Sequence, residues 1–414
     1  MDVHTYIRPA ARNHVSIFAS VEMAPGDPIL GLTEKYVADP RKEKVNLGVG
    51  IYVDDQGKVP VLDAVRQVEQ ALARDNLAHS YLPIDGLPAY NRETQQLLFG
   101  AGAPILEAGR VATAQTIGGS GALRVGADLL KQVLGANAKL AISNPSWGNH
   151  HVVFRTAGFQ LVDYRYYDDA SHGLDFAGML ADLGKLEPGT VVLLHACCHN
   201  PTGVDLDAAQ WAQVVALLKD RGLLPFVDMA YQGFDKSATE DATAVRLLAD
   251  SGIPAFVVAN SYSKSFSLYG ERVGALSFVG ADRDEAARLL SKIKTTIRAN
   301  YSSPATHGAR LVAGVLGSVE LRALWEQELG AMRDRIHTMR GAFVDQLAAL
   351  GAPDFGFINK QAGMFSYSGL SKAQVDRLRD EFAIYALSSG RICVAALNTG
   401  NIDYVTRAVA AVCR

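Results

Sequence analysis

Short apolar runs alternate along the chain with longer stretches in which apolar residues recur every three or four positions. The runs predict short buried strands, and the longer stretches predict amphipathic helices. Strand candidates lie at residues 140–142, 191–194, 224–227 and 255–259, and a helix candidate begins at Ser120. Strands that alternate with helices favour an α/β fold, in which crossover helices connect a mostly parallel sheet.

The pattern changes near residue 325. Apolar residues from Met332 to Leu350 recur at helical spacing over a long stretch. Ser371 and Gln374 then form a capping-box pattern ahead of another apolar stripe. We interpret this region as a second, smaller domain, and we join to it the segment that precedes the first clear α/β unit. The predicted division is an N-terminal extension at 1–17, a small domain at 18–59 and 326–414, and a large domain at 60–325.

Composition and charge narrow the class of protein. The 414 residues carry a net charge of −3, and their lysines and arginines are scattered, so no nucleic-acid partner is predicted. No apolar run approaches the roughly 18 residues of a membrane helix, and the first fifteen residues lack the apolar core of a signal peptide. The 4 cysteines are too few for a disulfide framework, which predicts a cytoplasmic location.

Chemically active side chains follow several of the predicted strands. Asn200, Asp228 and Lys264 each come at or soon after the end of an apolar run. The glycine-rich stretch 118–121 stands where a helix begins. Because ligands bind outside the carboxyl ends of parallel strands, we expect these groups to meet at one edge of the sheet.

Each of these groups also has a plainer interpretation. The glycines could form an ordinary tight turn, Asp228 could cap a helix or join a structural ion pair, and Lys264 could be a surface lysine. Together they supply what pyridoxal phosphate requires: a lysine that forms a Schiff base, an acid beside the pyridine nitrogen, and a phosphate site. The glycine spacing matches neither the P-loop nor the dinucleotide-binding motif, so nucleotide cofactors are not predicted.

The stretch HACCHNPTG, residues 195–203, crowds two histidines and two cysteines into five positions. Adjacent cysteines do not easily both turn toward one tetrahedral ion, so zinc is not predicted and no metal site is expected. Buried cysteines more often act as small apolar residues.

Five motifs, in a fixed order, resemble a known family. They are NPSW at 144–147, CCHNPTG at 197–203, DMAYQGF at 228–234, SYSKSFSLYGERVG at 261–274 and SGR at 389–391. They resemble the class I aminotransferases of the aspartate and aromatic branch, from roughly residue 18 to the end. The resemblance implies the α/β fold-type I architecture of pyridoxal-phosphate-dependent transferases, with a mostly parallel seven-stranded sheet in the large domain and a smaller α/β domain. It also implies a homodimer with shared active sites.

The resemblance assigns roles to the matching residues. Lys264 would bind the cofactor covalently, Asp228 would pair with its pyridine nitrogen, and Tyr81 would reach it from the other subunit; these three are the expected catalytic residues. The expected cofactor-binding residues are Gly119, Ser120, Gly121, Trp147, Asn200, Asp228, Tyr231, Ser261, Ser263, Lys264, Arg272 and Tyr81. The expected substrate-binding residues are Gly50, Trp147, Asn200, Arg298 and Arg391.

The two arginines would take different carboxylates. Arg391 is expected to bind the substrate α-carboxylate as a bidentate fork, and Arg298 is expected to come from the partner subunit and meet a side-chain carboxylate. His150 and His195 match positions behind the aspartate. Asn144-Pro145 and Asn200-Pro201 match places where the family uses cis peptide bonds.

The expected reaction is the reversible transfer of an amino group from tyrosine or phenylalanine, and also from aspartate or glutamate, to 2-oxoglutarate. Two half-reactions at one site imply ping-pong kinetics. Val53, Ser120 and Ser303 favour the aromatic branch, because aspartate enzymes often carry a basic residue, threonine and asparagine at those positions. Ser80 is less apolar than that branch suggests.

Other activities remain open from the sequence. A strict aspartate aminotransferase is the nearest alternative. A pyridoxal phosphate β-lyase or decarboxylase would share Lys264 and Asp228 but has less need of two carboxylate-binding arginines. A transcription regulator built on an aminotransferase domain would need an added DNA-binding segment, and the extension at 1–17 is too short for one.

Overall fold

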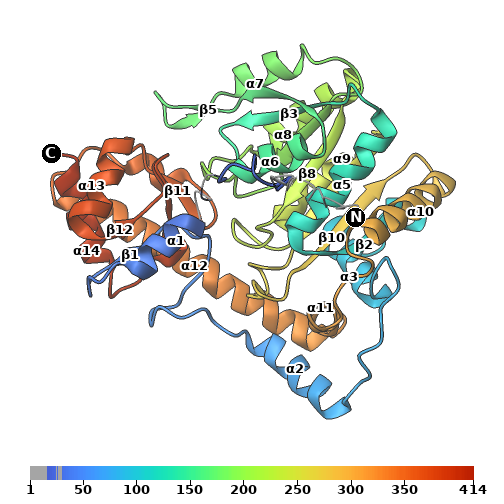
Figure 1. The fold of residues 1–414 in the computed structure, drawn as a ribbon, viewed down its shortest axis with the longest axis horizontal. Coiled ribbons are helices and arrows are strands. Elements are labelled where there is room, and N and C mark those ends of the chain that lie inside the picture. Colours follow the sequence, from blue (N-terminus) through green and yellow to red (C-terminus); the bar gives the residue numbers. More distant parts are fainter. Residues whose placement is uncertain (1–15, 25, 27–29) are drawn as a thin grey trace, which may run out of the picture.

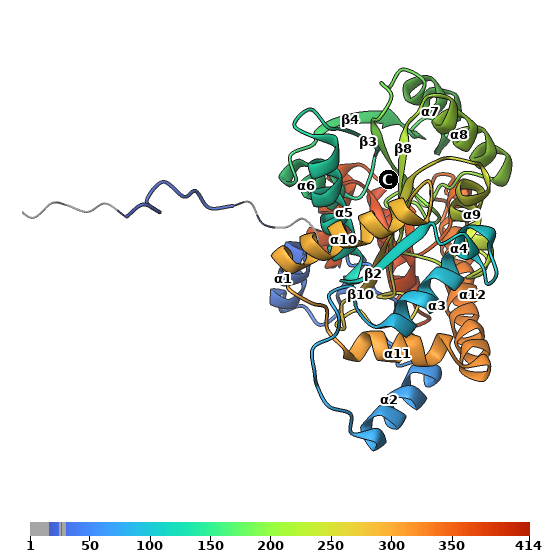
Figure 2. The ribbon, with the colours of Figure 1, turned by 90° about the vertical axis from the view of Figure 1, so that its right-hand side faces the viewer.

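The computed structural model describes residues 16–24, 26 and 30–414. All but the last two residues of the predicted N-terminal extension, 1–17, therefore lie outside the described residues. Figure 2 shows residues 16–24 extending away from the folded body. Ile17, Phe18 and Met23 are exposed in this segment.

A seven-stranded sheet forms the centre of the molecule (Figure 1). In spatial order its strands are β2 (Val111–Ile117), β10 (Val273–Val279), β9 (Phe256–Ser261), β8 (Leu224–Met229), β7 (Val191–His195), β3 (Lys139–Asn144) and β4 (Gln160–Arg165). Every predicted strand coincides with or overlaps one of these. The prediction at 255–259 began one residue early and stopped two residues short of Ser261.

The strand directions bring the predicted active groups to one edge. The pairs from β9 through β4 are parallel, whereas β10 runs antiparallel to both of its neighbours, β9 and β2. Because β2 and β9 are each antiparallel to β10, they run in the same direction. The carboxyl ends of six of the seven strands therefore lie at the same edge, and the predicted mostly parallel seven-stranded sheet is confirmed.

Side chains alternate between the two faces of the sheet, as the period of two in a strand requires. In β7, Val191 and Leu193 belong to one buried apolar cluster and Val192 and Leu194 to the other. One face is covered by α5 (Gly118–Leu134), α6 (Gly148–Thr156) and α10 (Arg283–Asn300). The other is covered by α3 (Pro88–Phe99), α7 (Phe176–Leu183), α8 (Ala208–Asp220), α9 (Thr243–Asp250) and α11 (His307–Leu316). The helix α2 (Asp63–Asp75) packs against α11 at the periphery of the molecule.

The C-terminal part adds a second layer of smaller elements. The helix α12 (Val319–Ala349) is 31 residues long and runs from beside α11 into this part (Figure 1). The C-terminal part also contains α13 (Lys372–Phe382), α14 (Ile402–Val412), β11 (Phe365–Tyr367), β12 (Ile384–Tyr385) and β13 (Arg391–Cys393). Earlier in the chain lie α1 (Leu30–Ala38), β1 (Val45–Asn46), α4 (Pro104–Glu107), β5 (Tyr167–Asp168) and β6 (Gly173–Leu174). Short 3₁₀ turns lie at Glu240–Ala242, Gly356–Lys360 and Val394–Ala396.

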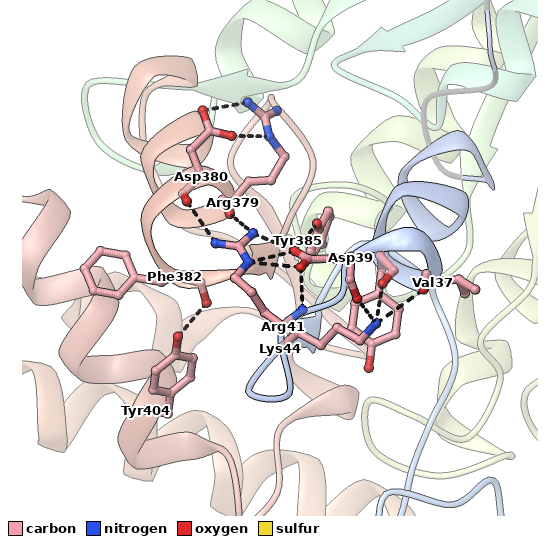
Figure 3. Close-up of polar contacts among 10 residues, drawn as sticks. Val37, Asp39, Arg41, Lys44, Arg379, Asp380, Phe382, Tyr385 and Tyr404 are labelled. Carbon is pink, nitrogen blue, oxygen red and sulfur yellow. Dashed lines mark hydrogen bonds and ion pairs between the residues drawn. The ribbon is translucent and has the colours of Figure 1, made fainter.

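Polar contacts join the segment near residue 40 to the C-terminal part (Figure 3). Arg41 donates to the backbone oxygens of Arg379 and Asp380 at 2.8 and 2.9 Å, and Tyr385 donates to Asp39 at 2.6 Å. In addition, β1 pairs in parallel with β12. These contacts join residues 39–46 to residues 379–385, all within the predicted small domain of 18–59 and 326–414. The predicted boundary at 326 falls inside the continuous helix α12.

Two local features predicted from the sequence, a helix cap and a pair of cis peptide bonds, are present in the structure. Ser371 and Gln374 form a reciprocal capping box at the start of α13, as predicted. The peptide bonds Asn144-Pro145 and Asn200-Pro201 are cis, also as predicted. No helix within the described part of the chain is long and apolar enough to cross a membrane.

Candidate active site

A cavity of about 300 Å³ opens at the carboxyl edge of the sheet. Its wall combines charged and aromatic side chains with small residues that leave room for a ligand. The lining residues are Val49, Gly50, Gly119, Ser120, Leu123, Trp147, His150, His195, Cys197, Asn200, Asp228, Ala230, Tyr231, Ser261, Ser263, Lys264, Tyr269, Arg272, Phe365 and Arg391.

Lys264 lies three residues after the end of β9, in the turn that follows that strand. Its Nζ atom is 4.9 Å from the centroid of the Tyr231 ring. Burial lowers the pKa of Lys264 to about 8; the charge of Asp228 opposes this shift, and the charges of Arg272 and Arg391 add to it. Roughly a tenth of this amine is therefore uncharged at pH 7, and the fraction rises to about one half at pH 8, which supplies the neutral form that a nucleophilic or basic lysine requires.

Asp228 is held by a chain of hydrogen bonds at the end of β8. Its Oδ2 atom bonds His150 Nε2 at 2.8 Å, and Ser146 Oγ contacts both His150 Nδ1 and His195 Nε2, at 3.0 and 3.1 Å. Burial alone would raise the pKa of Asp228, but the bond to His150 and nearby positive charge hold it below its usual range. Asp228 is thus an ionised carboxylate inside the cavity.

His195 supports this arrangement as a neutral side chain. Burial lowers its pKa to about 3, so the imidazole carries no charge near neutral pH. Its Nδ1 atom accepts the Asn200 backbone N–H at 3.4 Å. The predicted positions of His150 and His195 behind the aspartate are thus where the structure places them.

The start of α5 forms an anion-binding corner. No side chain caps this helix, so its first backbone N–H groups are free to bind a ligand. Gly118 has a φ of +70°, and a Cβ there would lie 2.6 Å from Arg272 Nη2. Arg272 Nη1 donates to Ser263 Oγ at 3.3 Å, and Ser263 N donates to Ser261 Oγ at 3.2 Å. Helix dipole, guanidinium and hydroxyls together suit a phosphate group.

Arg391 begins β13 and points across the cavity toward the large sheet. It is buried, and it donates from Nη1 to Asn200 Oδ1 at 3.0 Å and from Nη2 to the Gly48 backbone oxygen at 2.5 Å. Its Nε atom is buried without a partner. Asn200 Nδ2 in turn lies 3.5 Å from the Tyr231 hydroxyl. A carboxylate entering the cavity would meet a desolvated guanidinium with unused donor capacity.

Two carboxylates that sequence reasoning missed organise the loops around the site. Asp205 accepts the backbone N–H groups of Cys198 and His199 at 2.5 and 2.8 Å. Asp241 does the same for Gly233, Asp235 and Lys236, in the turn that follows Tyr231. Burial raises the pKa of Asp205 to about 7, although these backbone donors oppose the shift.

Other residues that line or support the cavity were also not predicted from the sequence. Phe365 and Tyr269 line the cavity, and His199 bonds Ser143 Oγ and Thr202 Oγ1 at 3.0 and 2.8 Å behind it. Asp205 and His199 had a detectable signal, because both lie within or just after the HNPTG motif. Phe365 had none, since it reads as one more apolar residue of a short strand.

Three predicted site residues do not line the cavity. Gly121 lies in the first turn of α5, where a Cβ would meet Ile117 Cγ1 at 3.0 Å. Tyr81 is 94% exposed. Arg298 is exposed near the end of α10 and donates to the Ser302 hydroxyl. The remaining predicted residues, from Gly50 to Arg391, all come together in the cavity wall.

The residues present fit pyridoxal phosphate. Lys264 supplies an amine of lowered pKa, Asp228 an ionised acid, and the start of α5 with Arg272 a phosphate-sized anion corner. Asn200, Tyr231 and Trp147 add polar and aromatic contacts in the same wall. By contrast, the described residues contain no group of three or more His, Cys, Asp or Glu side chains that could hold a metal ion.

Known proteins match this chain over almost its whole length. The family model described as aminotransferase class I and II matches residues 42–409. An aspartate aminotransferase of Pseudomonas aeruginosa is 57% identical over 95% of this chain and 99% of that protein. An aromatic-amino-acid aminotransferase of Escherichia coli is 49% identical over 96% and 100%.

Solved structures agree. A crystal structure of an aromatic-amino-acid aminotransferase from Burkholderia pseudomallei, covalently bound to pyridoxal phosphate, is 59% identical and superposes with a TM-score of 0.94 over 97% of this chain and 100% of that one. The cytoplasmic aspartate aminotransferase of Saccharomyces cerevisiae is 35% identical, with a TM-score of 0.94 over 96% and 98%. The chain belongs to the class I and II aminotransferase family.

Proposed function

We propose that this aminotransferase uses pyridoxal phosphate to move amino groups from phenylalanine and tyrosine, and also from aspartate and glutamate, to 2-oxoglutarate. The observation that carries the proposal is the convergence of Lys264, Asp228 and Arg391 on one cavity. A lysine of lowered pKa, an ionised acid and a buried carboxylate-binding arginine are the three groups that amino-acid chemistry on this cofactor needs.

Arg391 binds and orients the substrate. The α-carboxylate is common to every amino acid, and a planar guanidinium can hold both of its oxygens at once. The buried setting strengthens this charge pair, because water competes poorly there. Asn200, which already accepts from Arg391 Nη1, keeps the guanidinium aligned with the cavity.

Lys264 and Asp228 act on protons at two different atoms. When bound, pyridoxal phosphate supplies an electron sink that stabilises negative charge at the substrate Cα. The free Lys264 amine, whose pKa is near 8, would accept the proton that leaves the substrate Cα and donate it again within the cavity. Asp228, which is hydrogen-bonded to His150, would keep a proton on the ring nitrogen of the cofactor.

Three positions support the aromatic assignment. Val53, Ser120 and Ser303 replace the basic residue, threonine and asparagine that aspartate enzymes often carry. Ser120 lines the cavity, and both Val53 and Ser303 are half-buried. The similar proteins include both aspartate aminotransferases and aromatic-amino-acid aminotransferases, at comparable sequence identity to this chain. A strict aspartate aminotransferase is therefore kept as the second candidate.

We further propose a homodimer in which Tyr81 and Arg298 serve the partner's cavity. Tyr81 is 94% exposed and Arg298 lies on the surface, which supports a role outside the subunit that carries them. The 4 cysteines are free, which supports the predicted cytoplasmic location.

The test is kcat/KM for phenylalanine, tyrosine and aspartate, with 2-oxoglutarate as acceptor and the keto-acid product as readout. The proposal expects aromatic values of the same order as the aspartate value. Aromatic values about a thousandfold or more below that for aspartate would establish the strict aspartate enzyme instead. Absence of transfer from any amino acid would reject both assignments.

A further inference from the structure

A buried arginine outside the cavity has an unusual environment. Arg340, in α12, is only 2% exposed, and it forms no ion pair with any residue that the structure describes. Burial lowers its pKa to about 10, so it remains charged near neutral pH. Its Nη1 atom is buried without a hydrogen-bond partner.

All of the hydrogen bonds that Arg340 does form go to one short segment. Nη2 donates to the backbone oxygens of Gly363 and Phe365, the latter at 3.4 Å, and Nε donates to Ser366 Oγ at 3.3 Å. A buried guanidinium without a carboxylate partner is expensive to desolvate. An apolar side chain of similar volume would serve stability alone at least as well, so the arginine indicates a further role for the segment that it binds.

The segment carries Phe365 into the cavity. The Phe365 ring centroid is 4.0 Å from Arg391 Cζ and 5.9 Å from the Tyr231 ring. On its other side, a Cβ added to Gly50 would lie 2.6 Å from Phe365 Cζ. The ring therefore fills the space between the proposed carboxylate-binding arginine and the Gly50 backbone. A small shift of Phe365 would change both the plane of the Arg391 guanidinium and the room beside it.

Other contacts hold the segment on its remaining sides, and Arg340 supplies the hydrogen bonds from α12. Phe365 pairs with Cys393 and Tyr367 with Arg391 in the short β11–β13 ladder. The Ala362 N–H donates to the Gly203 backbone oxygen at 2.6 Å, next to the Asn200 turn. These bonds fix the segment to β13 and to the large domain, and Arg340 holds it from the helix behind.

We propose that Arg340 is a positioning residue that holds Phe365 against Arg391 and thereby sets the affinity for substrate carboxylates. The inference rests on the proposed function, because it takes Arg391 as the α-carboxylate site. Arg340 touches neither substrate nor cofactor. It acts through the backbone at Gly363 and Phe365, and the aromatic face it fixes stabilises the Arg391 cation as a cation–π partner.

The test compares Arg340→Met and Arg340→Lys with Phe343→Leu, a fully buried residue of the same helix. For Arg340→Met, KM should rise about tenfold for phenylalanine and for aspartate, with kcat within about twofold. Arg340→Lys keeps the charge but only one donor group and should recover part of the loss. Phe343→Leu should lower the Tm and leave KM unchanged. Arg340→Met that lowers the Tm alone would overturn the proposal.

A double-mutant cycle with Phe365→Leu tests the route. The Kd of 3-phenylpropionate, which has a carboxylate and a ring but no amine, is followed through the absorbance of the bound cofactor. Arg340→Met should weaken binding about tenfold in the wild-type background and hardly at all beside Phe365→Leu. Equal effects in both backgrounds would show that Arg340 does not act through Phe365. Failure of the proposed function is distinguished by the wild type itself, which would then show neither amino transfer nor a probe-dependent absorbance change.

Discussion

Lys264 and Asp228 lie near the ends of neighbouring strands, and each changes the protonation of the other. The pKa of Lys264 is about 8 because burial and two arginines outweigh the attraction of Asp228. In a short peptide, by comparison, a lysine amine titrates near 10.4. The site thus contains an amine that can lose its proton near neutral pH. The buried position of the lysine just after a strand, together with the neighbouring charges, is enough to produce this shift.

This shift can be measured in the cofactor-free protein. The rate at which an acylating reagent labels Lys264, followed by mass spectrometry, should rise with pH around a midpoint near 8. Asp228→Asn removes a negative charge and should lower the midpoint. Arg272→Met removes a positive charge and should raise it. A midpoint near 10.4 that neither variant moves would contradict the assigned electrostatics.

Asp228→Ala should still bind pyridoxal phosphate, because the phosphate corner and Lys264 are untouched. Turnover should fall by on the order of 10²- to 10³-fold, since the ring nitrogen would lose the carboxylate that keeps its proton. Turnover of His150→Asn should fall less, because this change removes only the hydrogen bond behind Asp228. Near-wild-type turnover of Asp228→Ala would contradict its role.

Sequence patterns identified residues that the structure brings together in the cavity, and they missed residues that hold the loops around it. Lys264, Asp228, Asn200 and Arg391 belong to motifs or follow strands, and the structure brings them together. Asp205 and Asp241 each bind two or three backbone N–H groups of a turn, which any short polar stretch could do. Such contacts depend on the path of the folded chain, so Asp241 had no signal in the sequence and Asp205 had only its position just after the HNPTG motif.

At the scale of elements, the site depends on how closely α5 approaches the sheet. Gly126 allows this contact, because a Cβ there would lie 2.7 Å from Phe226 Cζ and 3.2 Å from Leu276 Cδ1. Phe226 is two residues before Asp228 in β8. The middle of α5 therefore packs closely against β8, and this contact sets the distance between the helix and the strand that carries Asp228.

Gly126→Ala should overpack this contact and destabilise the protein by about 1–3 kcal/mol. It should also lower turnover, because Phe226 and β8 must move. Gly341→Ala in α12 is the matched control, since nothing lies within 4 Å of its added Cβ. That change should raise stability slightly, by about 0.5–1 kcal/mol. Thermal unfolding of both variants decides, and equal Tm values would count against the close-packing interpretation.

The sequence predicted four of the seven strands of the central sheet and none of the two-residue strands. Apolar runs of three to five residues identified β3, β7, β8 and β9, because burial on both faces gives a parallel strand a continuous apolar sequence. The strands β2, β10 and β4 were not predicted. The paired strands β1 and β12 have two residues each, which is too short for any period to show. The helix α12 was recognised only from about residue 325 onward, although it begins at Val319.

At the scale of the molecule, one subunit leaves two proposed site residues unused. Arg298 and Tyr81 lie outside the cavity, as the proposed homodimer requires, because each would serve the partner's site. Sequence alone could suggest this arrangement only through the resemblance to a family, since no pattern within one chain specifies a contact with a second copy. No single subunit can test this arrangement.

A heterodimer that carries Lys264→Ala in one subunit and Arg298→Leu in the other tests whether Arg298 serves the partner's cavity. Lys264→Ala homodimers should be inactive, and Arg298→Leu homodimers should be slow with aspartate because the side-chain carboxylate loses its cation. If Arg298 acts on the partner's cavity, a heterodimer of the two has one site with both defects and one site with neither. Heterodimers isolated through two different tags should then show about half of the wild-type aspartate activity.

Phenylalanine provides the internal control, because its turnover does not need Arg298. The heterodimer should show about half of the wild-type phenylalanine activity in either arrangement, from its single intact Lys264. If Arg298 instead serves its own cavity, each site of the heterodimer carries one defect and aspartate activity stays at about half the Arg298→Leu level. The shared site would be ruled out by a heterodimer that has half of the wild-type phenylalanine turnover but only half of the Arg298→Leu aspartate turnover. Such a dimer would be assembled and yet lack the complementation that a shared site requires.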